Sequence, residues 1–324
     1  VRSQKSEVGS RKSEVGSPKS IVPSPKSEVP SPKSKVHSPK SEVRGLKSAI
    51  RNPQSEIVSC PMIDLAPHHK RGLTLANPVM NAAGILGFAG EYRGLVDFAR
   101  LGAFVTNPLT FSPRAPARGP NVAPLPNGVL IHTGLPNPGV RAAVRRYAGV
   151  WARLGCPVIV HLAATSPDDV RRSVDLLERA DPVSGLELGL RDDVSADELA
   201  QLIRAAVGGP PLIVRLPLAR AAELCEVCAL SGADALTVAA PPRVSIQVGE
   251  QNVAGRLYSP DNFPTALEAV KAGASHGLSL PIIGAGGIFS IENARAMLEA
   301  GAVAVQVDAA VWRNVKMLDG LAQT

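Results

Sequence analysis

The sequence has few aromatic residues, few cysteines and no long apolar run. Its 324 residues include 6 Phe, 3 Tyr and 2 Trp, and its 4 cysteines are too few for a disulfide framework in a chain of this length. No stretch reaches the roughly 18 uncharged apolar residues of a membrane span, and none has the pattern of a signal peptide. We therefore expect a cytoplasmic protein with no membrane partner.

The net charge of +7 is confined to the first 60 residues, which contain 12 Lys or Arg and 5 Glu. The remaining 23 basic and 23 acidic residues cancel. The basic segment repeats a heptapeptide, roughly Lys-Ser-Glu-Val-x-Ser-Pro, but each copy has only one dependable apolar position and most contain proline, which disfavours a coiled coil. We predict that residues 1–58 form a disordered low-complexity tail and that residues 59–324 form the folded domain.

The tail leaves three interpretations open: a basic arm for an anionic surface, an array of Ser-Pro phosphorylation sites, or a solvated extension without a partner. Lysine and glutamate alternate along it, and no aromatic residues are interleaved to stack on bases. These features favour the solvated extension and predict no nucleic-acid partner.

From about residue 73 onwards, short apolar runs alternate with amphipathic segments of helical length. Uninterrupted apolar runs are typical of strands buried on both faces of a parallel sheet. The predicted strands are 79–83, 103–106, 158–162, 185–188, 212–216, 235–238, 281–284 and 302–307. The predicted helices are 91–101, 141–154, 167–179, 195–207, 219–230, 264–275, 291–298 and a closing helix over 311–323. This order predicts an α/β fold, a (β/α)8 TIM barrel, and a doubly wound sheet is the alternative.

Three local motifs add detail. Ser195 and Glu198 form a capping-box pattern at one helix start, and Cys225 and Cys228 are predicted to pack within a helix rather than to bind metal. The seventh strand runs into adjacent glycines at 286–287. In a barrel that position commonly binds phosphate through free backbone N–H groups, so it predicts a phosphate cup.

Five segments in this order and spacing resemble the dihydroorotate dehydrogenase family of pyrimidine biosynthesis. They are residues 77–84, 134–139, 255–260, 281–288 and 301–307. The resemblance runs from about residue 73 to residue 312 and implies flavin mononucleotide (FMN) as cofactor. In that family a hydride passes from C6 of dihydroorotate to flavin N5, while a Cys or Ser base removes the C5 proton.

The resemblance also implies site residues. Ala82, Ala83 and Gly84 match the backbone that lies along the flavin ring, and Arg215 stands where the family has a lysine. The implied cofactor-binding set is Ala82, Ala83, Gly84, Asn107, Arg215, Gly255, Gly286 and Gly287. The implied substrate-binding set is Asn107, His132, Gly134 and Leu135.

Several positions depart from the family pattern. Asn107 replaces a lysine, and three asparagines are replaced by Gly189, Val194 and Ala240. Asp192 occupies the position of the catalytic base, which makes it the candidate base. The alternative is that Asp192 is one of two acids favoured by a helix dipole.

At the end of the eighth strand the family's glycine is Asp308, and a further family glycine is Ser259. A carboxylate beside a phosphate is repulsive unless it turns away or is protonated. Two histidines, His132 and His161, lie where they could act as a general acid or flavin neighbour, or could simply pack.

The sequence is therefore compatible with two functions. The first is an FMN-dependent oxidoreductase that acts on a CH–CH bond of a small ring substrate other than dihydroorotate. The second is a non-catalytic barrel that keeps the fold and some phosphate or flavin binding. The expected partner is a small-molecule substrate, and a homodimer is left open.

Overall fold

The computed structural model describes residues 62–119, 121–248, 250–275, 277 and 279–321. The predicted tail over residues 1–58 and its boundary with the folded domain lie outside these residues. Within them, no helix has both the length and the apolar character needed to cross a membrane.

Eight parallel strands form the core sheet, in the order β3-β14-β13-β10-β9-β8-β7-β4. The strands are β3 (Val79–Asn81), β4 (Phe104–Val105), β7 (Val158–Ala163), β8 (Gly185–Gly189), β9 (Leu212–Pro217), β10 (Ala235–Ala240), β13 (Ile282–Ala285) and β14 (Ala304–Val307). A bridge between Met80 and Ala103 joins the two outermost strands and closes the barrel. All eight predicted strands are present, so the predicted (β/α)8 barrel is confirmed.

The side chain of Asn81 completes the closure between β3 and β4. Its Nδ2 donates to the backbone oxygen of Val105 at 2.7 Å, and its Oδ1 accepts from the Val105 N–H at 3.1 Å. Because β4 has only two residues, the backbone ladder is short here, and the buried amide supplies the missing pairing.

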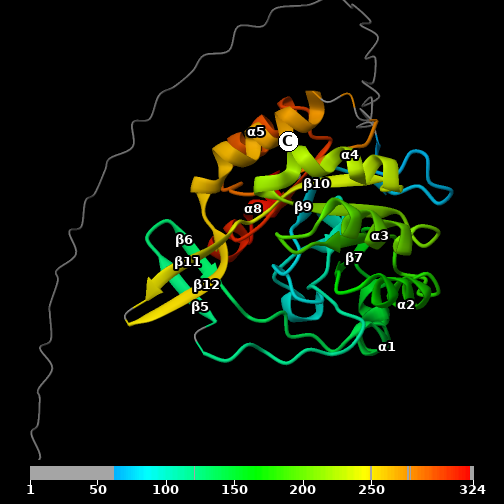
Figure 1. Cartoon of the computed structure of the whole chain (residues 1–324), viewed down its shortest axis with the longest axis horizontal. Coiled ribbons are helices and arrows are strands. Elements are labelled where there is room, and N and C mark those ends of the chain that lie inside the picture. The colour runs from blue at the N-terminus through cyan, green and yellow to red at the C-terminus, as the bar shows by residue number, and fades with distance from the viewer. Residues whose placement is uncertain (1–61, 120, 249, 276, 278, 322–324) are drawn as a thin grey trace, which may run out of the picture. The chain divides into compact units, whose positions relative to one another are not determined.

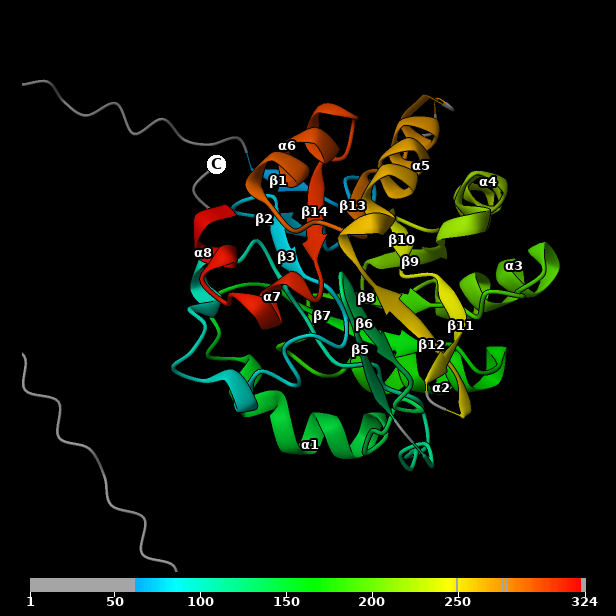
Figure 2. The ribbon, with the colours of Figure 1, turned by 90° about the vertical axis from the view of Figure 1, so that its left-hand side faces the viewer.

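Six helices surround the barrel (Figures 1 and 2). They are α1 (Val140–Trp151), α2 (Pro167–Leu177), α3 (Ala196–Ala206), α4 (Ala221–Ser231), α5 (Phe263–Ser275) and α6 (Ile291–Glu299). Ser195 caps α3 by accepting from the N–H of Glu198 at 3.1 Å, but the Glu198 carboxylate binds Arg191, so only this half of the predicted capping box is confirmed. Cys225 and Cys228 are free thiols buried on α4, as predicted for packing residues.

The predicted helix over residues 91–101 is wrong. The segment forms two single 3-10 turns, η1 (Gly90–Tyr92) and η2 (Phe98–Arg100). Between them Gly94 has φ +81°, a left-handed conformation that an α-helix does not contain.

The predicted closing helix over residues 311–323 is also wrong in its described part. The chain forms α7 (Ala310–Arg313) and α8 (Met317–Leu321) instead. Asn314 separates them in an extended conformation, and its Oδ1 accepts from the Lys316 N–H, a local bond that competes with helix continuation.

A second, antiparallel sheet was not expected from the sequence. It has the order β11-β12-β6-β5 and is built from β5 (Val122–Leu125), β6 (Gly128–Ile131), β11 (Arg243–Val248) and β12 (Gln251–Tyr258). Its two hairpins follow β4 and β10, so the sheet lies at the C-terminal ends of the barrel strands, in front of the barrel in Figure 2. Its strands are only partly apolar and partly exposed, which is why their pattern does not stand out.

The barrel interior is apolar at its N-terminal end. Side chains from the strands form one buried cluster there with leucines beside the hairpin of β1 (Ile63–Asp64) and β2 (Thr74–Leu75). The cluster includes Met80, Val105, Ile159, Ile213, Ala235, Ile283, Ala304, Leu65, Leu73 and Leu75. The polar interior residues are therefore confined to the opposite end, where active sites of such barrels lie.

Replacing Asn81 with alanine tests the closure. We expect Asn81→Ala to lower the free energy of unfolding by about 2–4 kcal/mol, because the Val105 N–H and C=O become buried groups without partners. Urea unfolding followed by circular dichroism measures the change. Asn252→Ala, at an exposed position of β12, is the matched control and should cost less than about 0.5 kcal/mol. Equal effects of the two changes would show that the Asn81 amide does not hold the closure.

Candidate active site

A buried carboxylate, Glu187 on β8, lies at the centre of the polar end of the barrel. Its Oε1 is 2.7 Å from His161 Nδ1 on β7. Its Oε2 accepts from Thr237 Oγ1 on β10 at 2.8 Å and from Gln306 Nε2 on β14 at 2.5 Å. Side chains from three other strands thus meet on one carboxylate that is fully shielded from solvent.

Arg215 on β9 supplies the positive charge beside this carboxylate. Its Nη1 is 3.6 Å from Glu187 Oε1 and donates to Gln306 Oε1 at 2.8 Å. Burial opposes the ionisation of Glu187, but the hydrogen bond with His161 and the charge of Arg215 outweigh it and lower the pKa of Glu187 to about 2. The carboxylate is therefore charged at neutral pH, and Arg215 is its counter-ion.

The imidazole of His161 fits because residue 189 has no side chain. A Cβ on Gly189 would lie 2.3 Å from His161 Nε2 and 2.7 Å from its Cε1. The asparagine that the family resemblance implies at this position could not coexist with the ring as it is placed. In the neutral ring with Nδ1–H donating to Glu187, the other nitrogen, Nε2, carries the lone pair.

Asp192, the candidate base, lies in the loop after β8 and is bound to an arginine. Its Oδ1 accepts from Arg256 Nη1 on β12 at 2.6 Å, and the same nitrogen donates to the backbone oxygen of Pro241 at 2.8 Å. Both charged side chains are partly exposed. Arg256 therefore ties together the loops that follow β8 and β10.

Asp308 follows β14 and is 1% exposed, yet neither of its carboxylate oxygens has a hydrogen-bond partner among the described residues. Burial raises its pKa to about 6. The charge of Arg215 and the nearby backbone N–H groups of Ala309 and Gly287, which do not meet hydrogen-bond geometry, favour the ionised form less strongly. An acid in this environment carries an unpaired charge at neutral pH.

Tyr258 lies at the end of β12, near charged groups of the mouth. Burial raises its pKa, with smaller effects from the charges of Arg215, Asp308 and Arg256. Its ring lies 6.0 Å from that of Trp312.

The other implied flavin residues also lie at the C-terminal ends of strands. Ala82 directly follows β3, and its N–H donates to the Val307 oxygen at 2.8 Å. Ala82 therefore lies next to the peptide group that joins Val307 to Asp308. Ala83 and Gly84 come next, with Gly84 at φ +86°. Asn107 follows β4, and its buried Oδ1 has no partner among the described residues.

The other three implied substrate residues lie in the loop after β6. His132 follows β6 and donates its backbone N–H to Asn121 O at 2.8 Å. Gly134 and Leu135 both have positive φ, +75° and +55°, and the Leu135 oxygen accepts from Asn137 Nδ2 at 2.9 Å. The buried Asn137 amide therefore helps to fix the loop from within.

Gly255, one of the implied cofactor residues, has a structural constraint of its own. It lies within β12, and a Cβ there would be 2.6 Å from the Ile131 oxygen of β6. The glycine is thus required by the close approach of these two strands. The cup glycines Gly286 and Gly287 have φ +103° and +70°, as a turn directed at a ligand or a neighbouring helix requires.

Sequence reasoning missed Glu187, Thr237, Gln306 and Arg256 as functional residues. Glu187, Thr237 and Gln306 interrupt the apolar runs of predicted buried strands, which is the signal that could have identified them. Arg256 carried no such signal, because the antiparallel sheet that positions it was not expected.

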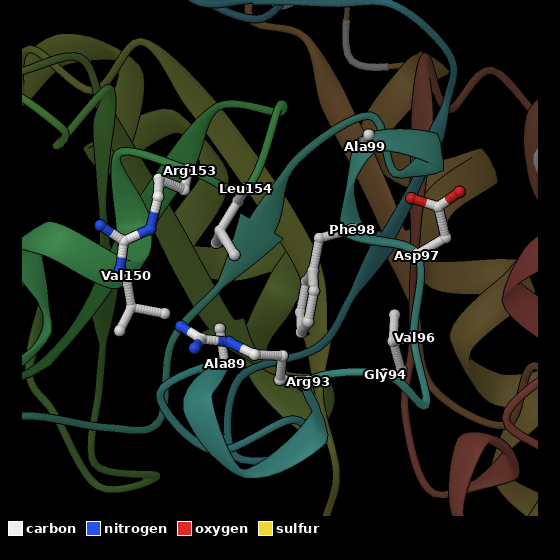
Figure 3. A pocket seen from close by; sticks show the side chains of 10 residues that line it. All are labelled: Ala89, Arg93, Gly94, Val96, Asp97, Phe98, Ala99, Val150, Arg153 and Leu154. Carbon is white, nitrogen blue, oxygen red and sulfur yellow. The ribbon is translucent and has the colours of Figure 1, made fainter.

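A pocket of about 290 Å³ lies away from this site. It is lined by residues that flank η1, by η2 with the residues before it, and by the end of α1 with the residues after it, and Phe98 lies between them (Figure 3). Figure 3 shows the guanidinium groups of Arg93 and Arg153 on one side of it and the Asp97 carboxylate turned to the other. Because η2 precedes β4 and α1 precedes β7, this pocket is at the N-terminal end of the strands, opposite the polar cluster.

Removing the central charge should destabilise the barrel. We expect Glu187→Gln to cost about 3–5 kcal/mol of unfolding free energy, because Arg215 is left as a buried charge without a counter-ion. Since the folded pKa lies below the ordinary value of 4.5, this contribution is present above about pH 4.5 and is lost as pH falls towards 2. Glu268→Gln, in the exposed pair with Lys271, is the control, and urea midpoints of the two variants that coincide would contradict the assignment.

Asp308 should give the opposite pH dependence of stability from Glu187. Its folded pKa of about 6 lies above the ordinary 3.8, so the unfolded chain loses this proton first, and stability falls between about pH 4 and pH 6. The loss corresponds to about 3 kcal/mol. We expect Asp308→Asn to remove this pH-dependent loss, measured as the difference between variant and native unfolding free energies across this range. A difference that does not change with pH would show that Asp308 is not strained by burial.

Comparisons with known proteins identify the family of this chain. The family model for dihydroorotate dehydrogenase matches residues 68–190 and 213–324. The chain is 32% identical over 273 residues to the catalytic subunit of dihydroorotate dehydrogenase B (NAD(+)) from Pelobacter propionicus, covering 78% of this chain and 89% of that protein. The corresponding subunit from Desulforudis audaxviator is 34% identical over 259 residues, covering 74% and 84%.

A solved structure has the same fold. The crystal structure of the Eimeria tenella enzyme DHODH in complex with ferulenol superposes with a TM-score of 0.67 at 20% identity, covering 84% of this chain and 85% of that one. The resemblance carried by the five sequence motifs is therefore confirmed. The chain belongs to the dihydroorotate dehydrogenase family.

Proposed function

We propose that this chain is a dihydroorotate dehydrogenase-like flavin oxidoreductase whose substrate has changed. Family membership supports the class of reaction, oxidation of a CH–CH bond in a small ring. The flavin-ring half of the site supports it further, since the small residues 82–84 and the buried cation of Arg215 are present at the C-terminal ends of β3 and β9.

The observation that carries the change of substrate is the ion pair of Asp192. The residue at the base position holds its proton-accepting oxygen 2.6 Å from Arg256 Nη1, so a substrate must displace or share that contact to be deprotonated there. The amides at positions 189, 194 and 240 are also replaced, by glycine, valine and alanine. A site built on hydrogen bonds loses about 10⁴-fold in discrimination or more when its partners are removed.

Two groups of this chain can accept a proton at the mouth. Asp192 is the candidate base by position, with Arg256 stabilising its charge. His161 is the second, because the hydrogen bond of Nδ1 to Glu187 fixes the ring and leaves Nε2 above Gly189. Either would need the substrate to approach from the side of β8.

FMN, which the family uses, fits the site only in part. The ring half is retained, but the phosphate half contains the buried, unpaired carboxylate of Asp308 beside Gly287. A phosphate dianion would meet a like charge there. The residues therefore do not fit the phosphate of FMN, and no reaction step is assigned to it.

A non-catalytic barrel is the second candidate, and Asp308 is the observation that favours it. In a barrel that no longer binds the cofactor, the phosphate position has no ligand to accommodate. A buried acid without hydrogen bonds can then occupy that position. This candidate keeps the polar cluster around Glu187, since that cluster holds the barrel strands together.

Reconstitution tests the proposal. We expect full-length protein incubated with FMN and riboflavin, then desalted, to keep the visible absorption of oxidised flavin. We further expect no bleaching of that absorption when dihydroorotate is added without oxygen, because the amides and the base have been replaced. A colourless protein would favour the non-catalytic barrel, whereas bleaching by dihydroorotate would show that the substrate has not changed. A matched dihydroorotate dehydrogenase B catalytic subunit is the positive control.

A further inference from the structure

Asp308 is placed where a phosphate ester would be expected in this fold. The glycines of the turn after β13 and the residue after β14 are neighbours at the ends of the seventh and eighth barrel strands. In (β/α)8 barrels, loops at this position commonly bind phosphate groups. Here the backbone N–H groups of Gly287 and Ala309 lie near the Asp308 carboxylate and favour its ionised form, but they do not meet hydrogen-bond geometry with it.

The arginine close enough to act on this carboxylate is already committed elsewhere. Arg215 directs Nη1 to Gln306 Oε1 and lies 3.6 Å from Glu187 Oε1, and it makes no ion pair with Asp308. Tyr258 is the other titratable side chain on which Asp308 acts. Both oxygens of Asp308 are thus hydrogen-bond acceptors without donors in the described part of the chain.

A buried acceptor without a donor costs free energy until a ligand or a proton supplies the missing hydrogen bond. A phosphate ester at neutral pH carries up to two negative charges and offers acceptors, so it adds repulsion and satisfies neither oxygen. A hydroxyl group offers an O–H donor and carries no charge. The chemistry of the cup therefore favours a hydroxyl over a phosphate.

We propose that Asp308 is a specificity residue that excludes phosphate esters from the cup and selects a flavin without the phosphate, riboflavin, whose side-chain hydroxyl donates to its carboxylate. The inference rests on the proposed flavin site and specifies which flavin that site takes. An unpaired charge in a pocket rejects the wrong ligand as well as binding the right one.

Titration of the full chain with each flavin, followed by flavin fluorescence, tests the proposal. We expect the native protein to bind riboflavin at least about tenfold more tightly than FMN, given the repulsion between like charges at an effective dielectric constant of about 20. Asp308→Asn keeps the shape and removes the charge, and Asp308→Gly restores the family residue. Both should raise the affinity for FMN at least about tenfold while changing that for riboflavin less.

Asp261→Asn is the matched control, because it removes one negative charge at an exposed position of η4 (Pro260–Asn262) without touching the cup. Its ratio of riboflavin to FMN affinity should equal that of the native protein. If Asp308→Gly does not fold, the isosteric Asp308→Asn carries the test.

Two outcomes overturn the proposal, and they differ in what else they overturn. Native protein that binds FMN as tightly as riboflavin, or an unchanged ratio in Asp308→Asn, contradicts the role of Asp308 and leaves the proposed flavin function standing. Failure of the native protein and both Asp308 variants to bind either flavin contradicts the flavin function and this inference together.

Discussion

The carboxylate of Glu187 imposes the main constraint on the barrel, because a buried negative charge must be surrounded by donors or the fold cannot hold it. Its donors come from β7, β10 and β14, and its counter-ion comes from β9. Four strands are therefore coupled through one side chain in addition to their backbone ladders. The apolar cluster at the other end of the barrel has no such requirement and depends on packing alone.

This constraint also determines which charged side chains at the mouth are able to bind a ligand or to react. Arg215 is the buried cation of the mouth, and its bonds to Gln306 and Glu187 leave it little freedom to bind an anionic ligand. The two aspartates at the mouth consequently differ. Asp192 is neutralised by Arg256 at the partly exposed side, whereas Asp308 is buried and unpaired. One is a stable ion pair and the other is a group that requires a proton or a ligand.

The fold was largely predictable because burial on both faces produces uninterrupted apolar runs. All eight barrel strands were found from such runs, and α1 to α6 from amphipathic periodicity. The failures have local causes. Gly94 takes a conformation closed to helices, and Asn314 bonds its own neighbours, so the helices predicted around them are interrupted. The antiparallel sheet was missed because its strands are only partly apolar and its two hairpins meet through one long-range pairing, that of β12 with β6, in which Arg256 lies opposite Ile131.

The site was predictable by position but not by interaction. Parallel strands bring their C-terminal ends together, so the residues after each strand were correctly expected at one mouth. What the sequence could not supply is partner choice: Asp192 with Arg256, Arg215 with Gln306, and Asp308 with nothing in the described chain. Such choices depend on side-chain distances between strands that sequence order does not contain.

The fit between His161 and Gly189 makes the residues at these two positions depend on each other. The imidazole occupies the volume that any side chain at position 189 would need. An asparagine at 189 alone would force the ring away from Glu187 and break the hydrogen bond that joins β7 to β8. The two positions therefore act as one packing unit, in which a larger residue at 189 requires a smaller one at 161.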